Sequence, residues 1–206
     1  MNIAALRLYN QQIAQTCFDE PEQVVAWLGG IQGQDYPGAK WSIGLRLAQV
    51  SDVGVARAID DGKILRTWPM RGTLHFVAAA DVRWILMLTS PKNIAGSANR
   101  RANLGLDDKA LARCREIFIK ILQGGKQKSR DEMYAALENA GIATQGQRGY
   151  HVLWNSALHG LICFAATTDK EQTFALLSGQ IKSGARDSEQ AGLLDAGGCC
   201  CAARAT

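Results

Sequence analysis

Apolar side chains recur at intervals of three and four through the first sixty residues, which is the spacing of amphipathic helices. Asp19 precedes one such stretch as a helix cap, with Glu22 three residues later and Pro21 in the first turn. Gly29 and Gly30 then end the stretch. The pattern predicts helices over Asn2–Gln15, from the Asp19 cap to Gly29, over Ala39–Leu47 and over Ser51–Asp60.

The period then changes. Residues Lys63–Val77 alternate β-favouring and polar side chains around a turn at 69–72, which predicts a hairpin. Three short helices followed by a hairpin are the order of elements in a winged helix-turn-helix. Asp81 is expected to cap a helix over Val82–Leu88, and Pro91 to stop it.

The second half repeats this order. Helices are predicted over Asp107–Leu122, from a Ser129–Glu132 capping box to Gly141, and over Gly149–His159, followed by hairpin strands at Leu161–Ala165 and Gln172–Leu176. The predicted fold class is therefore mainly α with short β-hairpin wings (α+β), as tandem winged helix-turn-helix units. The expected domains are 1–90, 91–177 and a divergent tail at 178–206, which is expected to be disordered.

Composition narrows the function classes only slightly. The 206 residues are 47% hydrophobic and 20% charged, with a net charge of +4, which permits a polyanionic partner without requiring one. No apolar run approaches a membrane span, so the expected location is cytoplasmic, with a monomer preferred.

Cys17, Cys114 and Cys163 are expected to be buried thiols. The adjacent cysteines at 199–201 match no zinc-ligand spacing, and no metal site is predicted.

Two polar patterns are candidates for function. Arg148, His151, Asn155 and His159 share one face of the third helix of the second half, as in a helix that reads DNA, although a plain solvated face has the same pattern. Earlier, two glutamines stand one residue apart in the segment IQGQ after the Gly29–Gly30 stop. A glutamine amide both donates and accepts hydrogen bonds and can hold a water, or it can satisfy free backbone groups at a helix end.

Several ordered blocks resemble one known family. The segments LRLYNQ, VVAWLGGIQGQDYPGAKWSIGLRL, RTWPMRGTLHFV, NLGLD, AGIATQGQRGYHVLW and LICF with QTFALL are similar to the winged-helix DNA-binding family that includes AlkZ-type and YcaQ-type DNA glycosylases. The resemblance runs from about Leu6 to Leu177. The family signature is Gln, any residue, then Gln or Asp, and the form with a second Gln is AlkZ-like.

The resemblance implies a monofunctional glycosylase that removes bulky N7-alkylated purines from double-stranded DNA, in the cytoplasm and near the nucleoid, without metal or organic cofactor. Gln32 and Gln34 are the implied catalytic pair. An N7-alkylated purine carries a positive charge and leaves readily, so the enzyme mainly has to place water beside the anomeric carbon. Asp35 and His75 are expected to support the site.

The remaining DNA contacts are expected from basic and polar side chains. Arg71 at the hairpin turn is predicted to contact a phosphate, while solvated or structural roles remain the alternative for it and for His75. The other expected DNA contacts are Lys126, Lys128, Arg130, Arg148, His151 and Asn155.

The chain also departs from the family. Family members continue beyond the position of Leu177, whereas residues 178–206 are rich in Gly, Ala, Ser and Cys, so we expect a truncated member with a divergent or out-of-frame end. The alternative function is a non-catalytic DNA-binding winged-helix protein or regulator. A metabolic enzyme has little support, because no glycine-rich phosphate loop or nucleophile triad is recognisable.

Overall fold

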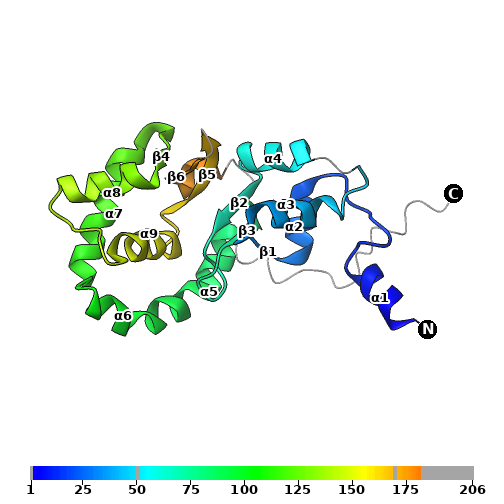
Figure 1. Ribbon diagram of the computed structural model, residues 1–206, viewed down its shortest axis with the longest axis horizontal. Helices are drawn as coiled ribbons and strands as arrows, with labels where there is room; N and C mark the ends of the chain where they lie inside the picture. The colour runs from blue at the N-terminus through cyan, green and yellow to red at the C-terminus, as the bar shows by residue number, and fades with distance from the viewer. Residues whose placement is uncertain (1, 50–51, 169–170, 182–206) are drawn as a thin grey trace.

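The computed structural model describes residues 2–49, 52–168 and 171–181. The fold is mixed α+β, and one antiparallel sheet of six strands runs through the molecule (Figure 1). The predicted mixture of helices and short hairpins is therefore confirmed. From edge to edge, the strands are β1 (Ile31–Gln32), β3 (His75–Ala78), β2 (Ile64–Thr67), β5 (Ile162–Thr168), β6 (Glu171–Leu176) and β4 (Lys128–Ser129).

The two halves of the chain repeat one order of elements. The first half runs α2–β1–α3–α4–β2–β3, and the second runs α7–β4–α8–α9–β5–β6. In each half the short first strand pairs with the last strand, so the two three-stranded parts of the sheet have the same strand order. The helices are α1 (Ile3–Asn10), α2 (Pro21–Leu28), α3 (Tyr36–Gly44), α4 (Asp52–Asp60), α5 (Val82–Gly96), α6 (Ala98–Asn103), α7 (Asp108–Leu122), α8 (Arg130–Asn139), α9 (Arg148–Leu158) and α10 (Leu177–Gln180).

Local capping chemistry explains where several of these helices begin and end. The side chain of Asp107 accepts a hydrogen bond from the Ala110 N–H at the start of α7. Ser129 and Glu132 form the predicted capping box of α8. Gly29 ends α2 in the left-handed conformation, at φ 69°. Glu20, and not Asp19, is the cap residue of α2.

Two features of the fold differ from the sequence prediction. The strands β1 and β4 were not predicted, because two residues are too few to show alternation. Helix α5 continues through Pro91, which was expected to stop it. Asn93, beyond the proline, donates a hydrogen bond to the Pro69 carbonyl at 2.8 Å, so a tertiary contact holds the second part of the helix. The predicted domain boundary between residues 90 and 91 lies inside α5.

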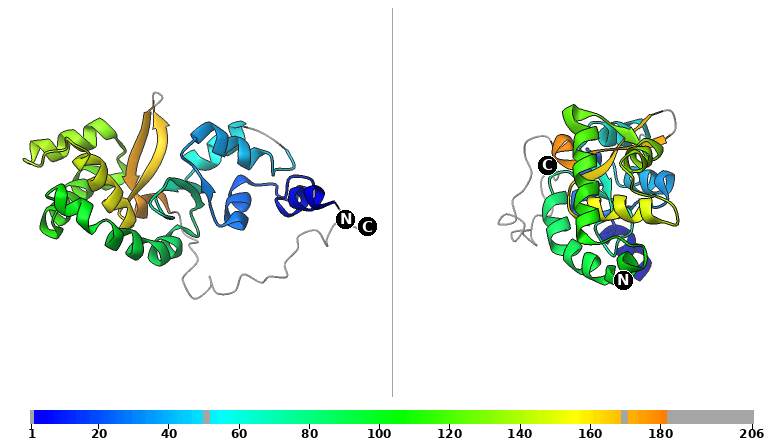
Figure 2. Two further views of the ribbon diagram at one scale, coloured as in Figure 1. Left: turned by 60° about the horizontal axis from the view of Figure 1, so that its bottom comes forward. Right: turned by 90° about the vertical axis from the view of Figure 1, so that its left-hand side faces the viewer.

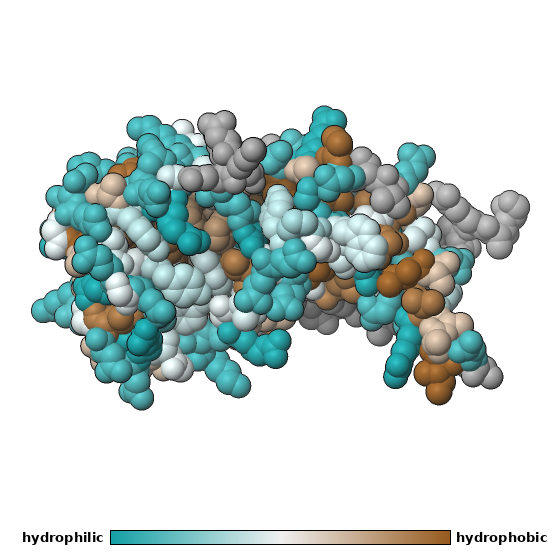
Figure 3. All heavy atoms as spheres, viewed as in Figure 1, coloured by the Kyte–Doolittle hydropathy of each residue, from teal (hydrophilic) through white to brown (hydrophobic). Residues whose placement is uncertain are grey.

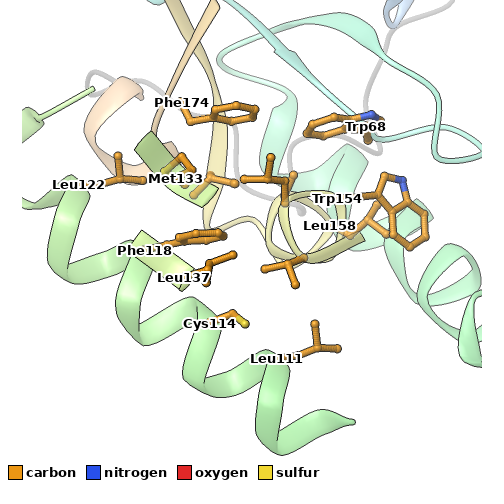
Figure 4. Close-up of a cluster of buried hydrophobic side chains, with 14 of the residues drawn as sticks. Trp68, Leu111, Cys114, Phe118, Leu122, Met133, Leu137, Trp154, Leu158 and Phe174 are labelled. Carbon is orange, nitrogen blue, oxygen red and sulfur yellow. The ribbon is translucent and has the colours of Figure 1, made fainter. Parts of the chain in front are cut away.

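The halves meet where β2 pairs with β5 through a single register pair, Arg66 with Phe164. The β5–β6 hairpin stands between the helices of the second half and the first half (Figure 2). Trp68, which follows β2 in the first half, lies in the apolar core of the second half with Phe164, Phe174 and Trp154 (Figure 4). The two halves therefore share sheet and core.

The start of the chain contributes no buried residue. Ile3, Leu6, Leu8 and Tyr9 of α1 are exposed, and their apolar side chains gather at that end of the molecule (Figure 3). No helix in the part of the chain that the structure describes is both long enough and apolar enough to cross a membrane. The predicted tail, from residue 182 onward, lies outside the described residues.

Candidate functional site

Gln32 and Gln34 lie at one edge of the sheet, on β1 and directly after it. Both side chains are exposed, and the Gln32 Nε2 donates a hydrogen bond to the Gln34 Oε1 at 2.7 Å. The two amides therefore bond to each other instead of satisfying the backbone at the end of α2. The Gln32 oxygen and the Gln34 NH₂ group remain to accept from and donate to a water molecule.

The pair is held in place by backbone pairing. Gln32 lies opposite His75 of β3, and the Gly33 N–H donates to the Leu74 carbonyl at 2.8 Å. A Cβ at position 33 would approach the Phe76 nitrogen at 3.3 Å, so a glycine there lets β1 lie close to β3. Gln32 points to one face of the sheet, and Gln34, which follows the end of β1, is held on that side by its 2.7 Å hydrogen bond with Gln32.

His75 joins the glutamines on that face. Residues directly opposite each other in an antiparallel pair have their side chains on the same side of the sheet, and His75 is the partner of Gln32. The imidazole Nδ1 donates to the Thr73 carbonyl at 2.9 Å, because a carbonyl only accepts. In the neutral ring Nε2 then carries no proton and can accept a hydrogen bond.

Asp35 has a structural task at the same place. Its Oδ1 accepts a hydrogen bond from the Gly38 N–H at 3.2 Å and caps α3. The cap fixes the direction in which the chain leaves Gln34. Its carboxylate is exposed and directly follows Gln34 in the chain, and its support of the site stays a prediction.

Arg66 was not among the predicted site residues, yet it holds the backbone of the signature. Its Nε and Nη2 donate to the Gly33 carbonyl at 2.9 and 2.6 Å. The residue is 8% exposed, and burial lowers the pKa of its guanidinium. One indication was present in the sequence. Arg66 lies two residues after Ile64 in the same strand, so its charge is on the same face of the hairpin as that apolar side chain.

Arg71 is exposed at the tip of the loop between β2 and β3, with a left-handed φ of 53°. Trp154 of the second half donates to the Gly72 carbonyl at 3.2 Å, and a Cβ at Gly72 would approach that tryptophan ring at 2.9 Å. Contacts with the other half of the molecule thus set the position of the loop that carries Arg71.

The prediction of a solvent-facing polar face on α9 is wrong at Asn155. This residue is 1% exposed, and its side-chain oxygen accepts a hydrogen bond from Arg115 at 3.1 Å. Arg148 is half-buried and donates to the Ala143 and Leu104 carbonyls. His151 packs edge-on against Tyr150 and Trp154. Helix α9 packs against α5, α7 and β5, so a single solvated face does not exist.

The basic residues after α7 lie at the opposite edge of the sheet from the glutamines. Lys128 belongs to β4, the last strand in the order, and forms an ion pair with Glu132 at 2.6 Å. Lys126 and Arg130 are exposed beside it. The structure therefore brings Gln32, Gln34, Asp35 and His75 together at the other edge, although the charge of Arg130 still acts on Arg66.

Two further features lie outside the glutamine site. Across residues 2–49, 52–168 and 171–181, no group of three His, Cys, Asp or Glu side chains is arranged to hold a metal ion. An apolar groove of about 640 Å³ runs between α5 and the end of α9. It is lined mainly by Leu86, Met87, Ile94, Leu158 and Leu177, and His159 is the member of the predicted polar face of α9 that also lines it.

The chain is 24% identical over 183 residues to the interstrand DNA cross-link repair glycosylase of Streptomyces sahachiroi, covering 86% of this chain and 49% of that protein. The solved structure of Streptomyces sahachiroi DNA glycosylase AlkZ matches with a TM-score of 0.75 at 23% identity, over 88% of this chain and 50% of that one. The chain thus spans about half the length of these relatives.

The model of the AlkZ-like DNA glycosylase family matches residues 25–195. The match continues beyond Leu177, where the resemblance was expected to end. It includes the Gln32–Gln34 signature and both halves of the sheet. The chain belongs to the AlkZ-like DNA glycosylase family.

Proposed function

We propose that this chain binds double-stranded DNA and hydrolyses the N-glycosidic bond of bulky N7-alkylated purines, with Gln32 and Gln34 positioning the water. The observation that carries the proposal is the exposed amide pair at the sheet edge, whose two side chains are joined at 2.7 Å and face the same side as His75. Family membership supports DNA glycosylase chemistry as the class of reaction.

The chemistry requires little acid catalysis. Alkylation at N7 makes the purine cationic, so the electrons of the C1′–N9 bond pass into the ring as the bond breaks and the base leaves neutral. The sugar becomes an oxocarbenium ion, and the oxygen of a water bonds to C1′ and loses a proton to solvent. Amide oxygens that point at the cation stabilise it, and a water held by the amides is already close to C1′ when the bond breaks.

Two winged-helix units are the proposed frame for this reaction. Each half has the order helix, strand, helix, helix, strand, strand, and in each the short strand pairs with the last one. Arg71, Lys126 and Arg130 are the exposed members of the proposed DNA contacts, together with the partly exposed Lys128. Phosphate contacts of this kind make affinity fall with salt.

The test is release of guanine that carries a bulky N7 adduct, formed by treating duplex DNA with a nitrogen mustard, by the purified chain, followed by mass spectrometry. Single-turnover rates are expected to fall about 100-fold in Gln32→Ala and in Gln34→Ala, since each removes a group aimed at the reacting centre. The control is Gln145→Ala, an exposed loop glutamine in the second half, which is expected to leave the rate unchanged.

Binding measured on the same duplex separates the two candidate functions. Salt-sensitive binding with no base release by the unsubstituted chain, while a full-length relative releases the base, contradicts the enzymatic proposal. That result supports a non-catalytic DNA-binding protein.

A further inference from the structure

Arg66 is a buried cation whose strongest contacts are to one backbone atom. Its Nε and Nη2 both donate to the Gly33 carbonyl, at 2.9 and 2.6 Å. Gly33 is the central residue of the signature, between the two glutamines. Two donors from a rigid planar group fix the direction of that carbonyl better than one point charge does.

The same guanidinium also contacts the second half of the molecule. Its Nη1 donates to the Gln172 Oε1, and its central carbon lies 5.0 Å from the centre of the Phe164 ring. On the other side it lies 5.5 Å from the Tyr36 ring, at the start of α3. Arg66 therefore connects the signature to the β5–β6 hairpin and to α3.

Stability alone does not account for a charge in this position. The ion pairs formed by the described residues do not include Arg66, and burial removes the hydration of its charge. An apolar side chain of similar volume often stabilises such a site as well or better. The two donors that meet at one carbonyl point to a requirement for geometry.

We propose that Arg66 is a positioning residue that fixes the Gly33 peptide plane and thereby the spacing and direction of the Gln32 and Gln34 amides. The inference rests on the proposed function of that pair. Rotation of the Gly33 peptide would move both flanking side chains, and a displacement of about 1 Å in a reacting geometry reduces rates by up to about 100-fold.

The test compares Arg66→Met and Arg66→Lys with Arg46→Met and Arg46→Lys. Arg46 is a matched control because it is also buried and donates to backbone carbonyls, of Gln11 at 2.9 Å and Ser42 at 2.6 Å, away from the signature. Three quantities are measured: the single-turnover rate of release of the same bulky N7-alkylated guanine, the Kd for the duplex, and the side-chain amide NMR signals of Gln32 and Gln34.

Arg66→Met is expected to lower the rate 10- to 100-fold, with the Kd within about threefold. The two glutamine amide signals are expected to move towards those of freely rotating glutamines. Arg66→Lys, which keeps the charge but donates from a single nitrogen, is expected to fall between, and it decides the question if Arg66→Met does not fold. The Arg46 variants are expected to change the melting temperature but neither the rate nor the amide signals.

An unchanged rate and unchanged amide signals in a folded Arg66 variant overturn the inference. A parallel loss of rate and melting temperature in the Arg66 and Arg46 variants also overturns it, because the role is then only structural. If the unsubstituted chain releases no base, the proposed function fails by itself. The amide signals alone then decide whether Arg66 orders the glutamine pair.

Discussion

Glycines near the glutamine pair have different roles because of what surrounds each Cα. At Gly33 a Cβ would press against the backbone of β3, so the glycine permits the pairing of β1. At Gly38 a Cβ would overlap the Asp35 carboxylate that caps α3. At Gly96, the last residue of α5, a Cβ would meet nothing within 4 Å. The same substitution should therefore have opposite effects at different helical glycines.

Gly38→Ala is expected to lower the free energy of unfolding by about 1 kcal/mol, because Asp35 must rotate away and the cap is lost. Gly96→Ala is expected to be neutral or to stabilise by up to about 0.5 kcal/mol, since alanine restricts the unfolded chain. Urea unfolding followed by circular dichroism measures both. Equal changes of the same sign in the two variants would contradict the assignment of the Asp35 cap.

At the scale of elements, α9 shows how a helix can carry polar residues without presenting them to a partner. Arg148 and Asn155 bond to groups on neighbouring segments, and His151 lies between aromatic rings. Burial and then the charge of Arg100 lower the pKa of His151. The neutral imidazole is therefore the form that the folded protein favours.

The lowered pKa of His151 predicts a loss of stability on acidification. In the unfolded chain the imidazole has a pKa of about 6.5, so just below that pH the unfolded state binds more protons than the folded state. The stability from this group is complete above the unfolded pKa and is lost as the pH falls towards the folded pKa. Urea midpoints at pH 7.5 and 5.5 measure this loss.

His151→Gln is expected to reduce the drop in the urea midpoint between these two pH values. The difference between variant and unsubstituted protein at pH 7.5 gives the packing effect of the substitution by itself. An equal drop in both proteins would show that His151 does not contribute to the pH dependence.

At the scale of the whole molecule, the two halves form one unit because sheet and core both cross between them. Strands β2 and β5 pair directly, and Trp68 of the first half lies in the core of the second. A small apolar cluster at the junction contains Cys163 together with Leu65, Val82, Leu86 and Leu177. Burial raises the pKa of the Cys163 thiol to about 12.

Cys163 is therefore a reporter of separation between the halves. At pH 8 only about one thiol in ten thousand is ionised at this pKa, and the side chain is fully buried, so iodoacetamide is expected to leave Cys163 unmodified in the folded protein. Half-buried Cys17 is the internal comparison. Peptide mass mapping measures both. Labelling of Cys163 as fast as Cys17 without denaturant would show that the halves come apart.

The sequence by itself determined the helices whose ends depend on neighbouring residues, such as the Ser129–Glu132 capping box and the Gly29 stop. It also determined the two hairpins and the position of the glutamine signature, which ordered blocks of residues identify. These features depend on side chains within a few positions of each other, so a linear pattern contains them.

Only the tertiary structure decided the pairing of β1 and β4, the passage of α5 through Pro91, the burial of Asn155 and the reach of Arg66 to Gly33. Each depends on a group distant in the chain: a partner strand, the Pro69 carbonyl, Arg115 or the signature backbone. A linear pattern shows which residues are polar or apolar, but burial and hydrogen bonding between distant residues are determined by packing.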